Sequence, residues 1–500
     1  MTAPAPVIAA ASLASTLAAR VATGLRFAGL FGTVVPSGVL ISAHLAGGGD
    51  VETIDALLPS GAESYPAVSP VIGAAFWYER ELHDLFGVVP AGHPRLEPLV
   101  LLPARQIRQD NQTEQNNQTG QDNRTREHPD EHLLPRHLTG KGVFTIPHGP
   151  VRSGVVESIE YLVETPGEDI PHLNMRIIYK HRGIEKRFEG LAAADGTLLA
   201  ERVEGIASVA HALAYCHAVE RIAGCAVPWR ARLVRVLHAE LERIANHLDV
   251  ATRLADAAGL AVATARFGRH KERVLRLVSR LCGSRYGRGV VVAGGVSGLP
   301  LAGPAEIFAE IGPLERDVAA DAAALMSTAS FLDRLRRTGP LRPERAREHG
   351  AVGPIGKASG YVDDVRVTRP YDGYPALGIL AGEPLSDGDA LARLHVRVQE
   401  AGQSFHLIRQ AADELADAGG GAVAAPCEPA SGRAVGWAEA PQGEVLYDVR
   451  VNDGRITRCR PRSASFHNLV LMHEVFAGDI LTDFPFIEAS FGLSVAGAAL

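Results

Sequence analysis

A polar segment without apolar side chains divides this sequence into two unequal parts. Residues 108–132 contain no Ala, Val, Leu, Ile, Met, Phe, Tyr or Trp. Such a segment cannot bury enough surface to offset the conformational entropy that is lost when a chain becomes ordered. We therefore expect a disordered polar linker over residues 104–140, between an N-terminal domain at 1–103 and a larger domain at 141–500.

The composition is that of a globular protein and gives no electrostatic reason to expect nucleic acid as a partner. The sequence is 46% hydrophobic and 21% charged, with a formal net charge of -7. No segment after the N-terminus has the roughly 18 uninterrupted apolar residues of a membrane span, so membrane association is expected through partner subunits. Five scattered cysteines form no C-x-x-C pair, which argues against a disulfide framework, favours a reducing cytoplasmic location and predicts no cysteine-ligated metal.

The N-terminal domain is expected to be a small α+β fold. Residues 25–42 and 67–90 alternate short β-branched runs with Gly and Pro. Within the second region, Glu79, His83 and Asp84 could form an acid–base or metal cluster. One histidine beside a carboxylate is weak evidence for a ligand set, because metal sites need several convergent donors. A capped structural turn is the favoured interpretation.

The larger domain is expected to be mainly helical, with β elements at both ends, which makes the fold class α+β. Strands are predicted over Val143–Ile146 and Val155–Val163, and a hairpin over 433–460 around Asn452-Asp453-Gly454. Long apolar periodicities predict the helices between them, at 201–224, 230–257, 262–282, 304–337 and 384–417.

The first of these helical patterns carries an unusual set of polar residues. On a helix over 201–220, Glu204, Ser208, His211 and Tyr215 would share one side, opposite apolar residues such as Leu213. A carboxylate, a hydroxyl, an imidazole and a phenol can hold or pass protons, which makes Glu204, His211 and Tyr215 candidate catalytic residues. The alternative is a half-exposed helix with short polar side chains and no function.

Several motifs connect the chain with one known pair of subunits. The segment Y-E-R-E-L-H-D-L-F-G-V-V-P-A-G-H-P-R-L at 78–96 resembles the signature of the small hydrophilic subunit of complex I. From residue 149 on, the chain is similar to the quinone-site subunit of complex I and to the large subunit of membrane-bound NiFe hydrogenases. The matching segments are G-P-V (149–151), H-R-G-I-E-K (181–186), E-L-E-R-I-A-N-H-L (240–248), G-P-I-G-K-A-S-G (353–360), P-Q-G-E (441–444) and R-P-R-S-A-S-F-H-N-L (460–469). The fused order is that of formate hydrogenlyase and hydrogenase-4 large subunits.

The resemblance also shows which metal chemistry this chain should lack. NiFe hydrogenases hold nickel and iron with four cysteines in two C-x-x-C pairs, because soft thiolates suit these metals. The first pair maps onto Glu204 and Ala207, and the second onto Pro485 and Glu488. We therefore expect no metal in this chain and no hydrogenase activity.

The quinone-site subunit of complex I implies roles for several further residues. It is similar to this chain in having acidic residues at the positions of Glu204 and Glu488, and its tyrosine at the position of Tyr215 lies where the quinone head group docks. Its arginine at the position of Arg182 lies beside the terminal iron–sulfur cluster of a partner subunit. The family's quinone-contacting histidine loop is replaced here, with Arg152 and Val156 at the histidine positions.

These observations predict a hydrophilic core subunit of a membrane-bound oxidoreductase complex of the NADH:quinone oxidoreductase and hydrogenase-4 type. It would lie on the cytoplasmic face of the membrane, held there by antiporter-like and other membrane subunits, and would couple electron transfer to ion translocation. A partner iron–sulfur subunit would supply electrons near Arg182. Quinone is one candidate acceptor, which the residues at the histidine positions leave open. Tyr215, His211, Glu204 and Glu488 would form the catalytic pocket, the chain itself would bind no cofactor, and the isolated chain would be inactive.

Two alternatives stay open at this point. The chain could be a non-catalytic scaffold or coupling subunit that connects a cluster-bearing subunit to the membrane arm, as the missing histidines and cysteines suggest. A formate hydrogenlyase-type NiFe hydrogenase is the least favoured interpretation, because thiolate ligation of nickel has no close substitute.

Overall fold

The computed structural model describes residues 7–101, 140, 142–152, 157–379, 382 and 385–500. The chain divides into two compact units, the first made of residues 1–167, 172–182 and Ala499, and the second of 168–171, 183–498 and Leu500. The linker predicted over 104–140 lies outside the described residues except for Gly140, so the predicted domain boundaries stay predictions.

The first unit is built on a four-stranded sheet with the order β1-β4-β3-β2. Strands β2 (Arg26–Val35), β3 (Gly38–Gly47) and β4 (Asp50–Pro59) form an antiparallel meander, and the short β1 (Ile8–Ala9) pairs with β4 in parallel. Helix α2 (Phe76–Phe86) packs on β2, with Trp77, Tyr78 and Leu82 buried. Helix α1 (Leu13–Ala22) precedes the meander. The predicted small α+β fold is therefore confirmed.

A second sheet of the first unit consists of β7 (Phe144–His148), β8 (Glu160–Thr165) and β9 (His172–Arg176), all antiparallel. Strand β7 agrees with the prediction over Val143–Ile146. Strand β8 begins later than predicted, and residues 153–156 of the expected run lie outside the described residues.

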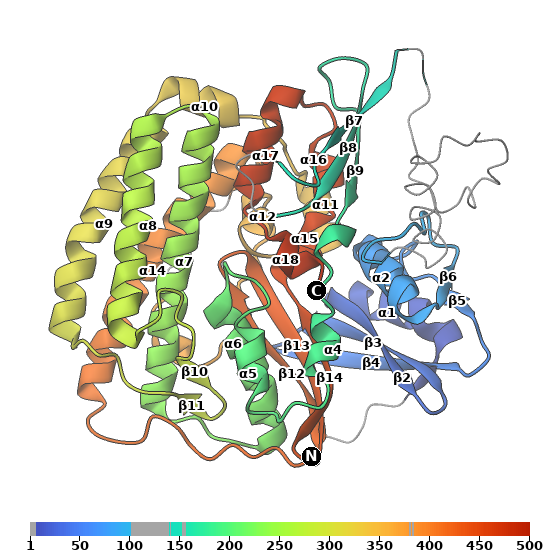
Figure 1. Cartoon of the computed structure of the whole chain (residues 1–500), viewed down its shortest axis with the longest axis horizontal. Helices are drawn as coiled ribbons and strands as arrows, with labels where there is room; N and C mark the ends of the chain where they lie inside the picture. The colour runs from blue at the N-terminus through green and yellow to red at the C-terminus, as the bar shows by residue number, and fades with distance from the viewer. Residues whose placement is uncertain (1–6, 102–139, 141, 153–156, 380–381, 383–384) are drawn as a thin grey trace, which may run out of the picture. The chain divides into compact units, whose positions relative to one another are not determined.

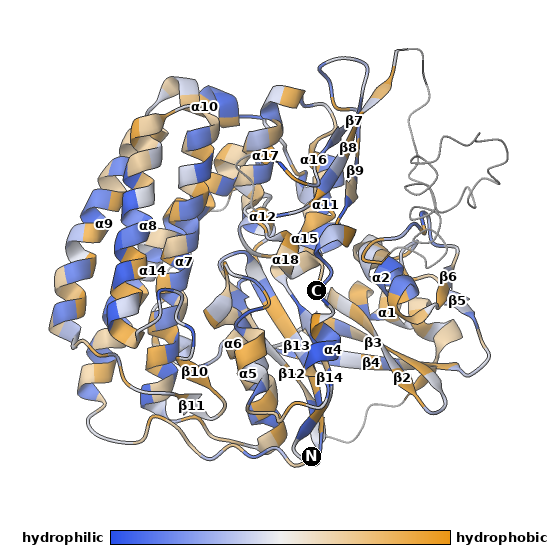
Figure 2. Cartoon of the chain, viewed as in Figure 1, coloured by the Kyte–Doolittle hydropathy of each residue, from blue (hydrophilic) through white to orange (hydrophobic). Residues whose placement is uncertain are grey.

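The second unit contains a bundle of long helices that run alongside one another (Figure 1), namely α7 (Trp229–Ala257), α8 (Ala261–Cys282), α9 (Pro304–Met326) and α14 (Ala390–Asp417). Hydrophobic and hydrophilic residues alternate around α8 and α9 (Figure 2), as expected of helices with one face in a core. Their apolar sides meet in a core that includes Leu237, Leu277, Ile311 and Phe405.

The helix predicted over 304–337 is interrupted. Helix α9 ends at Met326 and the short α10 (Ala329–Leu335) follows. The hydroxyls of Ser327 and Thr328 donate to the carbonyl of Ala324 at 2.8 and 3.0 Å. Side-chain hydroxyls of this kind offer the backbone an alternative to the helical ladder, which a periodicity of apolar residues does not reveal.

The second unit also contains a three-stranded antiparallel sheet made of β12 (Gly432–Ala440), β13 (Gly443–Asn452) and β14 (Arg455–Arg462). The predicted turn at Asn452-Asp453-Gly454 joins β13 to β14, so the hairpin is confirmed and extended by one strand. Helix α6 (Ser208–Ala223) packs on β12 and β13. Gly436 of β12 permits the close approach, since a Cβ there would lie 2.1 Å from the Ala214 carbonyl oxygen.

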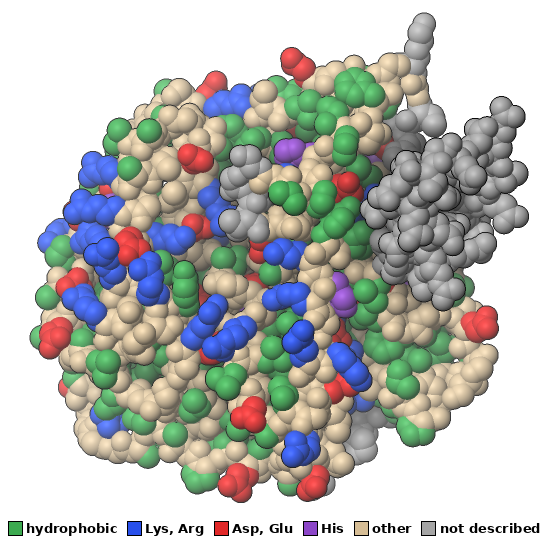
Figure 3. Space-filling view, viewed as in Figure 1, with side chains coloured by type: hydrophobic (Ala, Val, Ile, Leu, Met, Phe, Trp, Pro, Cys, Tyr) green, Lys and Arg blue, Asp and Glu red, His purple; other side chains and the backbone are tan. Residues whose placement is uncertain are grey.

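The surface of the helical bundle is rich in charge. Figure 3 shows Lys and Arg side chains interspersed with acidic ones over this region. Arg273 pairs with Asp317 at 2.7 Å and Arg280 with Glu310 at 2.9 Å, so helices α8 and α9 are joined by exposed ion pairs. No helix in the described part of the chain is long and apolar enough to cross a membrane.

Candidate functional site

Helix α6 is shorter than predicted, and this changes the place of Glu204. The helix begins at Ser208, so residues 201–207 form a loop and Glu204 is not on the helix. The first amides of α6 are bound by a side chain from another helix, because the Glu242 carboxylate accepts from Val209 N–H at 2.7 Å and from Ala210 N–H at 3.1 Å. A capped helix start of this kind comes from tertiary structure and has no local sequence signal.

The polar side of α6 is buried and not exposed to solvent. Glu204 and Ser208 are each 1% exposed, and His211 and Tyr215 are fully buried. The half-exposed helix that we considered as the alternative is therefore wrong. Polar groups buried to this degree need hydrogen-bond partners within the protein or from bound water.

Glu204 and His211 form the centre of the site. His211 Nε2 lies 3.6 Å from Glu204 Oε1, and its Nδ1 forms a hydrogen bond of 2.8 Å with the Tyr447 hydroxyl from β13. Burial raises the pKa of Tyr447 well above its usual value, so this phenol stays protonated. The three side chains therefore form a row from a carboxylate through an imidazole to a phenol, which is an arrangement that can hold and shift a proton.

The far side of Glu204 is held by the C-terminal part of the chain. Ser465 of α15 (Ala464–Leu469) donates its hydroxyl to Glu204 Oε2 at 3.2 Å. Gly497 of α18 (Val495–Ala498) leaves room for the carboxylate, since a Cβ there would lie 1.7 Å from Glu204 Oε2. Glu204 is thus enclosed by three segments far apart in the sequence.

Three buried polar atoms at this site have no hydrogen-bond partner among the described residues: Glu204 Oε1, Ser208 Oγ and His211 Nε2. They belong to the start of α6 and the loop before it. Buried polar groups without a protein partner are rare in folded proteins. Where they occur, a bound water molecule or ligand usually supplies the missing hydrogen bond.

Tyr215 is fully buried, deeper in the protein than a side chain that contacts a substrate at the wall of a pocket. Its hydroxyl donates to the Ala193 carbonyl at 2.6 Å, and its ring lies 5.7 Å from that of Phe188 and 5.9 Å from that of Tyr447. It lines neither the pocket beside Gly205 and Ile206 nor the one beside His217 and Trp437. Its contact with the site is therefore through the Tyr447 ring.

Glu488 lies on α17 (Phe484–Phe491), where it is half-buried. The residues that the structure brings to Glu204 are His211 and Ser465. Whether Glu488 acts with them stays a prediction.

Arg182, expected near the electron entry, and Arg152, expected at a quinone-contacting position, lie in the first unit. Arg182 is half-buried and directly precedes Gly183, the left-handed residue before α4 (Ile184–Phe188). Arg152 is buried, with its guanidinium 5.0 Å from the Tyr161 ring centre. Val156 lies outside the described residues.

The acidic residues of α2 are structural. Glu79 is fully buried and accepts hydrogen bonds from the Tyr65 hydroxyl and from the amides of Val68 and Ser69. Asp84 accepts from the amides of Leu99 and Val100. These carboxylates organise the loops around them, which supports the interpretation as a capped structural turn.

The four positions that correspond to the hydrogenase cysteines do not fit nickel and iron. Ala207 is fully buried and Pro485 is exposed, and neither side chain has a donor atom, while Glu204 is already engaged by Ser465. Hard carboxylate oxygens are poor replacements for thiolates at such a centre. Across the described residues, no group of three or more His, Cys, Asp or Glu side chains is arranged to hold a metal ion.

Comparisons with known proteins agree with this architecture. Residues 257–427 and 421–498 match the family described as the respiratory-chain NADH dehydrogenase 49 kDa subunit, and residues 48–116 match its 30 kDa subunit. Formate hydrogenlyase subunit 5 of Escherichia coli (strain K12) is 30% identical over 450 residues, which is 88% of this chain and 77% of that protein. An NADH-quinone oxidoreductase subunit of Prosthecochloris aestuarii is 30% identical over 66% of this chain and 85% of that protein.

The chain belongs to the complex I 49 kDa subunit family. Its match to the 30 kDa subunit at the N-terminus makes it a fused member, as the motifs predicted. The carbon monoxide-induced hydrogenase of Rhodospirillum rubrum is 31% identical over 69% of this chain and 96% of that protein. The family therefore includes relatives named as hydrogenases as well as relatives named as quinone oxidoreductases.

A solved structure shares the fold of this 49 kDa family member. It is a chain of the membrane-bound sulfane sulfur reductase, an archaeal respiratory membrane complex, with a TM-score of 0.67 over 72% of this chain and 99% of that chain. At 24% identity this likeness shows the fold alone.

Sequence reasoning missed four residues that shape the site, namely Tyr447, Ser465, Gly497 and Glu242. Ser465 lies within the motif R-P-R-S-A-S-F-H-N-L, so the sequence identified its segment but not its hydrogen bond to Glu204. The other three carry no local signal, because their importance depends on contacts across the fold.

Proposed function

We propose that this chain is the hydrophilic core subunit of a membrane-bound respiratory-type oxidoreductase complex. It would accept electrons from a partner iron–sulfur subunit and couple their transfer to ion movement through membrane subunits. The observation that carries the proposal is the buried row of Glu204, His211 and Tyr447 inside a member of the complex I 49 kDa family. A buried group that can take up a proton is what links an electron transfer to proton movement.

The electron donor in this proposal is an iron–sulfur cluster of a partner subunit near Arg182. A fixed positive charge beside a cluster stabilises its reduced form, so the arginine would raise the cluster's potential. The chain itself contributes no metal ligands to this step.

The complex would be attached to a membrane through its other subunits. In support, the relatives include a membrane-bound hydrogenase subunit alpha of Pyrococcus furiosus, which is 30% identical over 68% of this chain. We place the chain on the cytoplasmic face, because scattered cysteines without a C-x-x-C pair are typical of proteins in a reducing compartment.

Quinone is the proposed acceptor, and its reduction consumes two protons with two electrons. The protons would come from the Glu204–His211 pair, whose facing atoms Glu204 Oε1 and His211 Nε2 lack hydrogen-bond partners in the described chain. Tyr215 would hold the Tyr447 ring in place, and Glu488 would belong to the same pocket.

The scaffold function is the second candidate, and two observations favour it. Arg152 replaces a family histidine and stacks on Tyr161, and the Tyr215 hydroxyl is bound to the Ala193 carbonyl. A subunit that has lost its acceptor site would keep the fold and still connect its partners.

Reoxidation of the partner cluster by a short-chain quinone distinguishes the two candidates. In the purified complex, the prereduced cluster is followed by electron paramagnetic resonance after quinone is added. The proposed function predicts that quinone reoxidises the cluster. It also predicts a lower cluster potential in Arg182→Gln than in the control Arg187→Gln, which changes an exposed arginine of α4. A cluster that stays reduced in the presence of quinone would support the scaffold function.

A further inference from the structure

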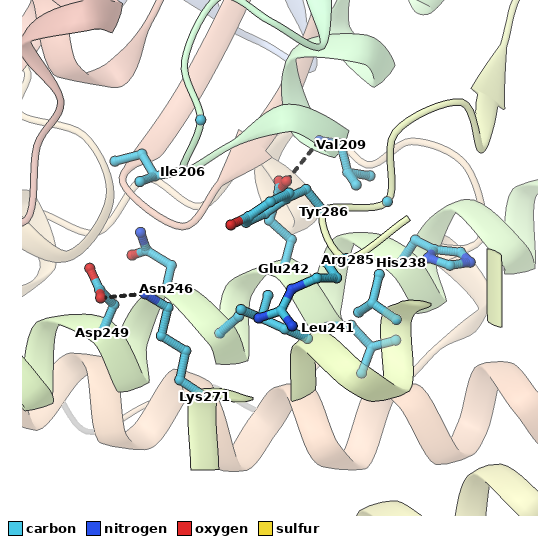
Figure 4. A pocket seen from close by; sticks show the side chains of 15 residues that line it. Ile206, Val209, His238, Leu241, Glu242, Asn246, Asp249, Lys271, Arg285 and Tyr286 are labelled. Atoms are coloured by element: carbon cyan, nitrogen blue, oxygen red, sulfur yellow. Dashed lines mark hydrogen bonds and ion pairs between the residues drawn. The ribbon is translucent and has the colours of Figure 1, made fainter. Parts of the chain in front are cut away.

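A pocket of about 80 Å³ lies between the start of α6, the loop before it and helix α7 (Figure 4). Gly205 and Ile206, which directly follow Glu204, form part of its wall, together with Val209 from the first turn of α6. Helix α7 provides the opposite wall, and the Arg285–Gly287 loop covers one side. The wall of the pocket therefore begins at the residue next to Glu204.

Glu242 is the carboxylate that faces this pocket from the α7 side. Its two oxygens accept from the amides of Val209 and Ala210, as the close view shows for Val209. No lysine or arginine pairs with it in the part of the chain that the structure describes. The other acidic residue of the pocket, Asp249, is paired with Lys271 at 2.6 Å and with Arg253 at 2.8 Å.

The unpartnered atoms of the buried site lie at this same end of α6. Ser208 is the first residue of the helix and His211 follows one turn later, while Glu204 lies in the loop before them. Each is at most 1% exposed, and each has a polar atom without a hydrogen-bond partner among the described residues. Water molecules bound to these atoms would connect the pocket with the Glu204–His211 pair.

We propose that Glu242 exchanges protons between this pocket and the buried Glu204–His211 pair, with bound water as the carrier. This inference rests on the proposed function, because it gives the proton-holding pair its route to solvent. The ligand of the pocket is then water and the protons that it carries.

The surroundings of Glu242 favour its protonated form at neutral pH. Burial raises the pKa of Glu242 to about 8, the two backbone N–H groups and Arg243 lower it, and the charge of Glu204 raises it. The other titratable and charged groups around the pocket are His238, Asp249, Lys271, Arg285 and Tyr286. A carboxyl with this pKa can give up and regain a proton near neutral pH, as a proton-exchange group must.

A simpler role for Glu242 is that of a cap for α6. A cap requires only an acceptor oxygen, whereas proton exchange requires a group that titrates. Glu242→Gln keeps an acceptor and removes the titration, and Glu310→Gln is a matched control in an exposed ion pair on α9. The thermal unfolding of both variants shows first whether the cap is preserved.

Infrared difference titration of the full chain tests whether Glu242 titrates as proposed. We expect a carboxylic acid band in the wild type that disappears with a midpoint near pH 8. Part of this band belongs to Glu439, whose pKa burial also raises to about 8, so the band should lose the Glu242 share in Glu242→Gln and keep its full intensity in Glu310→Gln. Glu204→Gln should move the midpoint to lower pH, because the loss of a neighbouring negative charge favours the ionised form. This second variant leaves Glu242 in place and does not depend on the fold of Glu242→Gln. A midpoint at the usual glutamate pH in the wild type would overturn the inference.

Proton uptake by the assembled complex then tests the role of Glu242. We expect Glu242→Gln to slow proton uptake about 10²-fold, within the range for loss of a proton-transfer group, with Glu310→Gln unchanged. Slowing in Glu204→Gln but not in Glu242→Gln would overturn this inference and leave the proposed function intact. No slowing in either variant would overturn the proposed function itself.

Discussion

Glu204 owes its place at the centre of the site to the absence of a side chain at Gly497. A Cβ at that position would lie 1.7 Å from Glu204 Oε2 and 3.1 Å from Ser463 Oγ. Both neighbours are buried, so neither can move into solvent to make room. The glycine is therefore a direct structural requirement of the buried carboxylate.

Gly497→Ala should destabilise the protein despite the better helix propensity of alanine. We expect a loss of about 1–3 kcal/mol in the free energy of unfolding, because the added methyl group overpacks a buried polar site. Gly205→Ala is the control, since a Cβ there meets nothing within 4 Å, and should change stability by less than about 1 kcal/mol. Chemical denaturation measures both. Equal stability of the two variants would show that the carboxylate is not confined as described.

At the residue scale, the sequence predicted that Glu204 and His211 lie together, but not through which elements. Glu204, His211 and Tyr215 were identified from their chemical types and spacing, and the structure brings Glu204 and His211 together. It does so through a loop and a helix rather than one helical face. Tyr447 could not be predicted, because no periodicity relates a strand residue to a helix more than two hundred positions away.

Helices α7 and α14 are joined by a largely buried network of charged residues. Glu240 of α7 is fully buried and accepts from Tyr374, Ser404 and Arg366. Burial raises the pKa of Glu240, but the positive charges of Arg243 and Arg366 lower it by more. The pKa of Glu240 therefore lies below its usual value, and the carboxyl is ionised. The motifs E-L-E-R and G-P-I-G-K thus contribute to one buried network, in which Lys357 binds Asp364 and Glu400.

Removal of one member of this network should be severe. Glu240→Ala leaves two buried arginines without their shared carboxylate, and we expect a loss of about 3–5 kcal/mol in the free energy of unfolding. Glu272→Ala removes a carboxylate from exposed pairs with Arg276 and Arg285 and should leave the stability close to that of the wild type, because solvent screens such pairs. Calorimetry of the two variants gives the comparison. A mild effect of Glu240→Ala would mean that water enters the network.

The elements themselves were predicted best where amphipathic patterns are long. Helices α7 and α8 begin within one residue of their predicted starts and end at the predicted residues 257 and 282. Helix α14 begins six residues after the predicted position, at Ala390, where the Asp389 side chain accepts from the Ala392 amide. The start of α6 depends on Glu242, which is a tertiary contact, so the apolar pattern before it was misleading.

At the scale of the whole molecule, the polar segment predicted as a linker should be the most accessible part of the chain. Limited proteolysis of the full chain should cut first within 104–140 and leave two folded fragments with boundaries near 103 and 140. The reason is the composition of 108–132, which offers no apolar side chains for packing. Mass spectrometry of the early fragments identifies the cuts. First cleavage inside 200–290 would show that the domain division is misplaced.

The most direct test of the central claim is coupled proton and electron transfer by the assembled complex with Glu204→Gln. This substitution keeps the size of the side chain and removes its titration. We predict that quinone-dependent turnover and the associated proton movement in liposomes fall about 10²-fold, as expected for loss of a proton-transfer group. Glu310→Gln, which alters an exposed carboxylate of α9, should remain close to the wild type. Full activity of Glu204→Gln, or a loss no larger than its loss of folded protein, would contradict the account.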